Sequence, residues 1–153
     1  MSLQSVQEFL ASHAPDIDII ETTESTATVT LAAHVHQVES GQIAKTLCLR
    51  SGDKDILVVL AGDARLDNKK LRQALGTKAK MHKPEDTLAL TGHPVGGVCP
   101  FGLATALTVY CDVSLQRYSE VLPAAGSVNS ALRISPERLA NLVHAQWIDV
   151  AQT

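Results

Sequence analysis

A twelve-residue segment rich in glycine and proline, GHPVGGVCPFGL at 92–103, constrains the fold of this chain more than any other. It contains four glycines and two prolines. Glycine lets a backbone approach a ligand closely and tolerates positive φ, whereas proline fixes φ and removes a hydrogen-bond donor. A loop with so few side chains suits an oxygen-rich ligand that backbone N–H groups can bind. A tight connection between two elements remains the alternative interpretation.

Length and composition predict a single globular domain spanning 1–153. A chain of 153 residues is long enough to bury a core without disulfides. Hydrophobic residues make up 45% and aromatic residues only 3%, so the core is expected to consist of Ala, Val, Leu and Ile. The scarcity of aromatic rings also leaves few platforms on which nucleic-acid bases could stack.

The cysteines and the N-terminal segment indicate a cellular compartment. Cys48, Cys99 and Cys111 form no C-x-x-C motif, and three sparse cysteines are typical of reduced thiols. The first residues lack the basic start and apolar core of a signal peptide, and no apolar run is long enough for a bilayer. We therefore expect a cytoplasmic protein that has no membrane partner.

Charge is distributed unevenly along the chain. The net charge is −3, which argues against a general nucleic-acid coat. Residues 63–83 nevertheless contain seven basic and two acidic residues, a net charge of +5, so the remainder carries −8. A local basic face would fit one docked polyanion, and a solvated helix face is the alternative. The candidate docking residues are Lys69, Lys70, Arg72 and Lys80.

Periodicity and turn signals predict an irregular mixture of helices and strands. Helices are expected over 6–13, 28–38 (ending at Gly41), 67–75, from 83 to the glycine-rich loop, and from 135 onward. Strands are expected over 17–20, 43–50, 56–61, 105–112, 131–134 and 147–150. Because these elements do not alternate strictly, we predict an α+β domain with a mixed sheet rather than a doubly wound fold.

Lys45 lies inside the predicted apolar strand and is the strongest single candidate for a functional charge. Alternation places it on one face with Ile43 and Leu47, and places Ala44, Thr46 and Cys48 on the other. The lysine either extends along the strand to solvent or points into a cleft as a fixed cation for a phosphate or a developing negative charge.

Other chemistry-bearing residues give weaker signals. His34 and His36 have a spacing found in metal sites, but residues two apart on a helix do not face each other, so no metal site is predicted. Cys99 could act as a thiol nucleophile in an exposed loop if His93 activated it, and a small inert side chain is the alternative. A second small polar loop, AAGSVNS at 124–130, is either a plain turn or part of a site.

Three of these segments together resemble a known family. QIAKTL at 42–47, GGVCPFG at 96–102, and AGSVN at 125–129 followed by SPERL at 135–139 occur in the order typical of the YbaK/ProX family. That family comprises aminoacyl-tRNA deacylases related to the editing domain of bacterial prolyl-tRNA synthetases. The resemblance covers nearly the whole chain and implies a mixed, barrel-like sheet surrounded by helices.

The resemblance also implies roles for particular residues. The essential lysine of the family falls on Lys45, and its glycine-rich loop contributes Gly96 and Gly97 to catalysis. The expected substrate-binding residues are Thr26, Thr28, Val98, Cys99, Pro100, Phe101, Gly126, Ser127 and Asn129. Cys99 stands where many relatives carry a small hydroxyl residue or alanine. The residues near Thr26, Thr28 and Asn129 do not identify the amino acid.

The expected activity is hydrolysis of the ester that joins a wrong amino acid to tRNA, without a cofactor or metal. The expected partner is mischarged tRNA, bound at its acceptor end, and an aminoacyl-tRNA synthetase is a second candidate. Such an ester is already activated, so the site needs to hold the carbonyl, polarise it with N–H groups and admit water. Two alternatives remain open: a non-catalytic module of the same fold that binds tRNA or a synthetase, and a small-ester hydrolase that uses Cys99.

Overall fold

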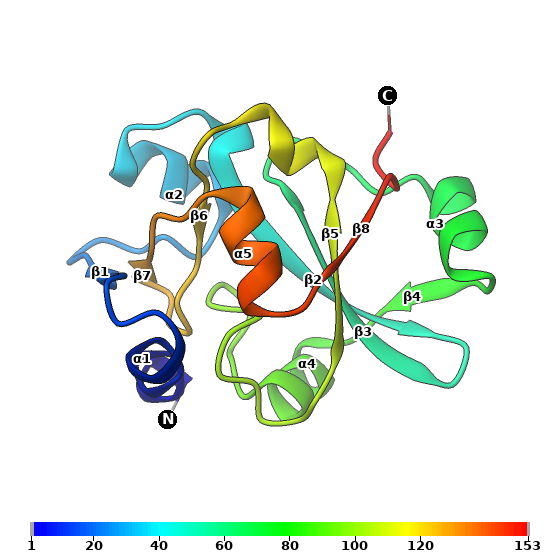
Figure 1. The fold of residues 1–153 in the computed structure, drawn as a ribbon, viewed down its shortest axis with the longest axis horizontal. Coiled ribbons are helices and arrows are strands. Elements are labelled where there is room, and N and C mark those ends of the chain that lie inside the picture. The colour runs from blue at the N-terminus through cyan, green and yellow to red at the C-terminus, as the bar shows by residue number, and fades with distance from the viewer. Residues whose placement is uncertain (1, 153) are drawn as a thin grey trace.

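The structure is a computed structural model that describes residues 2–152, and its core is a mixed sheet flanked by short helices (Figure 1). The α-helices are α1 (Ser2–His13), α2 (Val29–His36), α3 (Asn68–Leu75), α4 (Pro84–Thr91) and α5 (Pro136–Leu142). Two 3₁₀ helices span Ser40–Gln42 and Val113–Arg117. The predicted α+β class with a mixed sheet is therefore confirmed.

Six strands form the main sheet, in the order β4-β2-β3-β5-β8, with β6 pairing with β2. The central hairpin, β2 (Ile43–Ser51) and β3 (Lys54–Ala61), is antiparallel, and β4 (Ala79–Met81) joins it antiparallel. The strands β5 (Thr108–Asp112), β6 (Leu122–Pro123) and β8 (Gln146–Ile148) each join a neighbour in parallel. The predicted hairpin is thus the centre of the sheet.

A small second sheet extends this arrangement around α1. It pairs β1 (Ile20–Glu21) with β7 (Ser130–Ala131). Isolated bridges from Val121 to Ile134 and from Ala124 to Ala131 link the β6 segment to the β7 segment. The strands therefore curve from β8 through the main sheet to β1, and Figure 1 shows α1 beside the β1–β7 pair.

Local sequence signals fix most helix ends. The Asp67 side chain accepts hydrogen bonds from Lys69 N and Lys70 N at the start of α3, and Gly76 ends that helix with φ +79°. Ser135 caps α5 in the same way, with Pro136 at its first position. The helix predicted over 28–38 is present as Val29–His36, but Gly41 is not its stop, because Gln37 takes the left-handed conformation and closes the helix.

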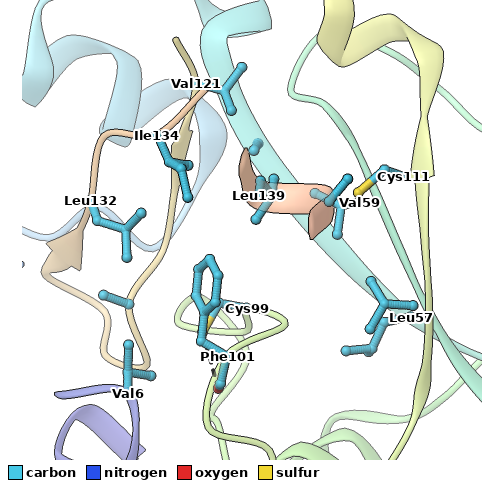
Figure 2. Packing of buried hydrophobic residues seen from close by; sticks show 14 of the residues in the cluster. Val6, Leu57, Val59, Cys99, Phe101, Cys111, Val121, Leu132, Ile134 and Leu139 are labelled. Carbon is cyan, nitrogen blue, oxygen red and sulfur yellow. Dashed lines mark hydrogen bonds between the residues drawn. The ribbon is translucent and has the colours of Figure 1, made fainter. Parts of the chain in front are cut away.

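The core lies between the sheet and the helices α1 and α5, and the glycine-rich segment contributes to it. Phe101 is fully buried at the centre of the cluster (Figure 2), between Val6 of α1 on one side and Leu57 of β3 on the other. The aliphatic composition predicted from the sequence is confirmed by the other buried members, among them Val59, Val121, Leu132, Ile134 and Leu139.

The shortest elements are where prediction and structure differ. Strand β1 (Ile20–Glu21) shares only Ile20 with the expected 17–20 segment, β5 begins at Thr108 rather than Thr105, and β8 ends two residues before 150. Strands β4 and β6 were not predicted. Strands of two or three residues carry too few side chains for an alternating pattern to be visible. No helix within residues 2–152 has the length and apolarity needed to span a lipid bilayer.

Candidate functional site

A cavity of about 360 Å³ lies along one edge of β2. This volume is within the range of small-molecule sites. Its wall comes from the start of α2, from β2, from the segment that joins β4 to α4, from the glycine-rich loop, and from β6 and β7. The lining residues are mainly apolar, and no Asp or Glu of the described chain is among them.

The cavity follows a stretch of β2 that lies between two strand pairings. The parallel pairing with β6 ends at Ala44, and the antiparallel pairing with β4 begins at Leu49. In Figure 1, β6 lies beside the start of β2 and β4 beside its end. Cys48 O accepts a hydrogen bond from His82 N on this side, so alternation directs the peptide groups of Thr46 toward the same edge. The side chains of Lys45 and Thr46 point to opposite faces of β2, yet both residues line a cavity that lies at its edge.

Lys45 is fixed by backbone carbonyls beside the cavity. Its Nζ donates to Gly62 O at 3.2 Å and to Ala64 O. An ammonium has three donors, so one remains for a ligand. Burial lowers the pKa of Lys45, while Asp63 opposes this shift and Arg65 adds to it. Lys45 lines the cavity, but Gly62 and Ala64, whose carbonyls hold its ammonium, do not, so its role as a fixed cation for a ligand stays a prediction.

The glycine-rich loop and the second small loop are packed directly against each other. Gly97 N donates to Pro94 O at 2.8 Å, and Gly97 O accepts from Gly126 N at 3.0 Å. A Cβ on Gly97 would lie 2.7 Å from Ser127 N. Gly96 and Val98 line the cavity, and their N–H groups have no hydrogen-bond partner within residues 2–152. Gly97 thus joins the loops while its two neighbours present amides near the cavity.

The second small loop, at 124–130, holds the segment 22–28 in place through hydrogen bonds. Asn129 Nδ2 donates to Thr22 O at 2.7 Å, and Thr26 N donates to Val128 O at 2.6 Å. Ser127 Oγ donates to Asn129 Oδ1 at 3.0 Å, which orients that amide. Thr26 and Thr28 line the cavity, whereas Gly126, Ser127 and Asn129 do not.

Cys99, Pro100 and Phe101 do not line the cavity, because all three are buried in the core behind the loop. Burial raises the pKa of the Cys99 thiol to about 12. Both ring nitrogens of His93 have partners other than this thiol: Nε2 donates to Phe101 O at 2.7 Å and Nδ1 bonds with Ser2 Oγ at 2.5 Å. The expectation of an exposed, histidine-activated thiol at Cys99 is wrong, so the alternative of a small-ester hydrolase loses the nucleophile on which it depended.

The candidate docking residues lie in α3 and β4, beyond one end of the cavity. Lys69, Arg72 and Lys80 are exposed, and Lys80 immediately precedes Met81 and His82, which line the cavity. Lys70 differs, because its Nζ donates to Ala151 O at 2.9 Å and pairs with Asp149 at 3.4 Å. The structure therefore brings Lys80 near the cavity and leaves Lys70 bound to the C-terminal segment.

Sequence reasoning missed several polar residues of the cavity, including His36, Thr46, His82, Thr87 and Ser130. The motif around Lys45 contained a signal for Thr46, because a side chain adjacent to a strand edge can reach the same site. The spacing of His34 and His36 marked both histidines but did not distinguish them: His36 lines the cavity, while His34 is exposed. Within residues 2–152, no three His, Cys, Asp or Glu side chains gather as a metal site would require.

Comparison with known proteins identifies the family. The model of the aminoacyl-tRNA editing domain matches residues 23–142. The uncharacterized protein YwhH of Bacillus subtilis is 47% identical over 99% of this chain and 98% of its own length. EbsC of Enterococcus faecalis, a proposed Cys-tRNA(Pro)/Cys-tRNA(Cys) deacylase, is 32% identical over 74% of this chain and 70% of its own.

Solved structures agree with the sequence comparison. The crystal structure of a proposed trans-editing enzyme for prolyl-tRNA synthetase superposes with a TM-score of 0.92 at 33% identity, covering 99% of this chain and 98% of the other. The hypothetical protein APE2540 gives a TM-score of 0.90 at 28% identity, covering 97% and 99% of the two chains. With the fold and the family match in agreement, the chain belongs to the aminoacyl-tRNA editing domain family of YbaK/ProX type, related to the editing domain of prolyl-tRNA synthetase.

Proposed function

We propose that this protein is a trans-editing deacylase that hydrolyses the ester of mischarged tRNA. The observation that carries the proposal is one cavity lined by Lys45, Gly96, Val98 and the open edge of β2. Its volume is large enough for an aminoacyl group. Membership of the editing-domain family supports the same substrate class.

The chemistry follows from what the cavity offers and from what it lacks. The N–H groups of Gly96 and Val98 would donate to the ester carbonyl and stabilise the oxyanion as it develops. The remaining donor of Lys45 would hold the terminal phosphate or ribose of the tRNA. The proposed activator of the water is the amine of the aminoacyl group or a ribose hydroxyl; no carboxylate of the described chain lines the cavity, although His36 and His82 do.

Replacing Lys45 tests this role directly. Lys45→Ala, and Lys45→Met, which keeps an unbranched stem and removes the charge, should each reduce kcat/KM for deacylation by about 100-fold or more. The matched control is Lys54→Met at the exposed start of β3, which should retain full activity. The measurement is release of amino acid from a panel of mischarged tRNAs, with circular dichroism confirming that each variant folds.

The same panel separates this proposal from the non-catalytic alternative. A wild-type protein that binds mischarged tRNA but releases no amino acid from any member of the panel would be a binding module. Wild-type rates in a folded Lys45→Met variant would remove the lysine from the mechanism. The panel includes Cys-tRNA because EbsC, a relative 32% identical, is a proposed Cys-tRNA deacylase.

A further inference from the structure

Two buried polar atoms in the cavity wall have no hydrogen-bond partner in the described chain: His36 Nε2 and Thr46 Oγ1. Leaving such a group unpaired costs about 1–3 kcal/mol, and buried polar groups in folded proteins are nearly always paired. Both atoms belong to residues that line the same cavity, although one lies at the end of α2 and the other in β2. Their unused hydrogen-bonding capacity therefore points to a group that a ligand supplies.

The two groups share a chemical character. A threonine hydroxyl both donates and accepts, and a neutral imidazole Nε2 does one or the other, depending on the tautomer. Burial lowers the pKa of His36, and nearby Arg133 lowers it further, which keeps the ring uncharged at neutral pH. Neither group can compensate a full charge, so a charged side chain would be poorly stabilised between them.

The remaining wall restricts the size and polarity of the ligand. Val29, Ala32, Ile43 and Leu122 give the cavity an apolar lining around these two groups. A purely aliphatic side chain would leave His36 Nε2 and Thr46 Oγ1 without partners, whereas a side-chain hydroxyl that reached either atom could bond to it. A thiol has similar size but is a weaker donor and acceptor.

We propose that His36 Nε2 and Thr46 Oγ1 form the side-chain subsite of the editing cavity and select aminoacyl esters that carry a hydroxyl, those of serine and threonine. This inference rests on the proposed deacylase function and adds its substrate class. It assigns the two residues a specificity role that is separate from the roles of Lys45 and the loop amides.

The test uses pairs of esters that differ only at the hydroxyl. One tRNA transcript is charged in turn with Ser, Ala, Thr, Val and Cys, and kcat/KM is measured for each. Threonine and valine are nearly isosteric, so their ratio reports the hydrogen bonds rather than the volume. The wild-type protein should favour Ser over Ala and Thr over Val by at least about 10-fold, because a site built to bond a hydroxyl rejects the analogue that lacks it.

Variants at the two residues assign the preference to its source. Thr46→Val preserves the shape and should bring both ratios to about 2-fold or less, because the loss on the hydroxyl esters should exceed any loss on the Ala and Val esters. His36→Leu should act in the same direction, and His36→Gln, which keeps a polar terminus, should restore part of the preference. If a variant slows all five esters equally, the replaced side chain acts on the tRNA end that the five substrates share. That result would overturn the assignment.

Other outcomes are equally decisive. Equal rates on Ser and Ala esters, or a preference for Cys over Ser, would overturn the hydroxyl subsite while leaving the deacylase intact. Absence of hydrolysis on every ester would instead contradict the proposed function. In that case, binding of non-hydrolysable 3′-amide analogues of seryl- and alanyl-adenosine still tests the subsite: tighter binding of the seryl analogue, lost in Thr46→Val, supports it, and equal binding overturns it.

Discussion

At the scale of single residues, His93 shows how burial sets the behaviour of a side chain whose sequence position indicated a different role. Its ring is fully buried, with one nitrogen bonded to Phe101 O and the other to Ser2 Oγ. Burial lowers the pKa of His93, and the bond to the Phe101 carbonyl only partly opposes this. The residue ties α1 to the glycine-rich loop as a neutral group.

This burial predicts a dependence of stability on pH. The folded-state pKa lies below the ordinary value of about 6.5, so the unfolded chain binds the proton more readily below that pH. The free energy of unfolding should therefore be constant above about pH 6.5 and fall as the pH drops, by at most about 1.4 kcal/mol per pH unit for this group. Urea unfolding followed by the fluorescence of Trp147, the single tryptophan, measures the slope.

Two variants isolate the contribution of His93. His93→Gln should be less stable at pH 7.5 and should show a shallower decline toward pH 5. His34→Gln, at an exposed position on α2, should keep the wild-type slope. An unchanged slope in a folded His93→Gln variant would contradict the assignment and would leave His36, whose pKa is also lowered by burial, as the titrating group.

At the scale of elements, the site depends on two loops that pack through bare backbone. Gly97 is absent from the residues with positive φ, so any L-residue could adopt its conformation. The restriction is space, because an added Cβ would meet Ser127 N at 2.7 Å and Gly126 C at 2.9 Å. The bond from Gly126 N to Gly97 O requires the same close approach.

Gly97→Ala should therefore force the loops apart. We expect a loss of about 1–3 kcal/mol in the free energy of unfolding, together with a fall in deacylation, because the amides of Gly96 and Val98 would move with the loop. Gly76→Ala is the control: a Cβ there meets nothing within 4 Å, and its φ of +79° costs stability at the end of α3, far along the chain from the loop. That variant should lose about 1 kcal/mol and keep its activity. Wild-type stability in Gly97→Ala would refute the packing argument.

At the scale of the whole molecule, the basic segment and the cavity meet at β4. Lys80 precedes two cavity-lining residues and is exposed, whereas Lys70 is held by Asp149 and Ala151 O. A protein of net charge −3 can attract a polyanion only through such a local surface. The acceptor stem of a tRNA whose end enters the cavity would pass over this region.

Charge reversal tests the docking surface. Lys80→Glu should raise KM for mischarged tRNA with little change in kcat, and should reduce the slope of log affinity against log salt by about 1, as expected for loss of one phosphate contact. Lys70→Glu should have a smaller effect on KM, because the Lys70 ammonium already has partners. Equal effects of the two reversals on KM would indicate that the docking surface extends over α3. An unchanged KM in both variants would indicate that tRNA docks on another surface.

The sequence by itself determined the features that depend on neighbouring residues: the central hairpin, the caps at Asp67 and Ser135, and the glycine-rich loop that adjoins the site. Each is a local signal, set by the φ preference or hydrogen-bonding capacity of a few adjacent residues. Only the tertiary structure decided that Cys99 is buried, that Lys45 is held by Gly62 and Ala64, and that His36 and Thr46 share a cavity. The physical reason is that burial and hydrogen-bond partners depend on segments far apart in the chain, which come together only in the folded protein. The cavity lies where β2 has no neighbouring strand, between its pairings with β6 and β4.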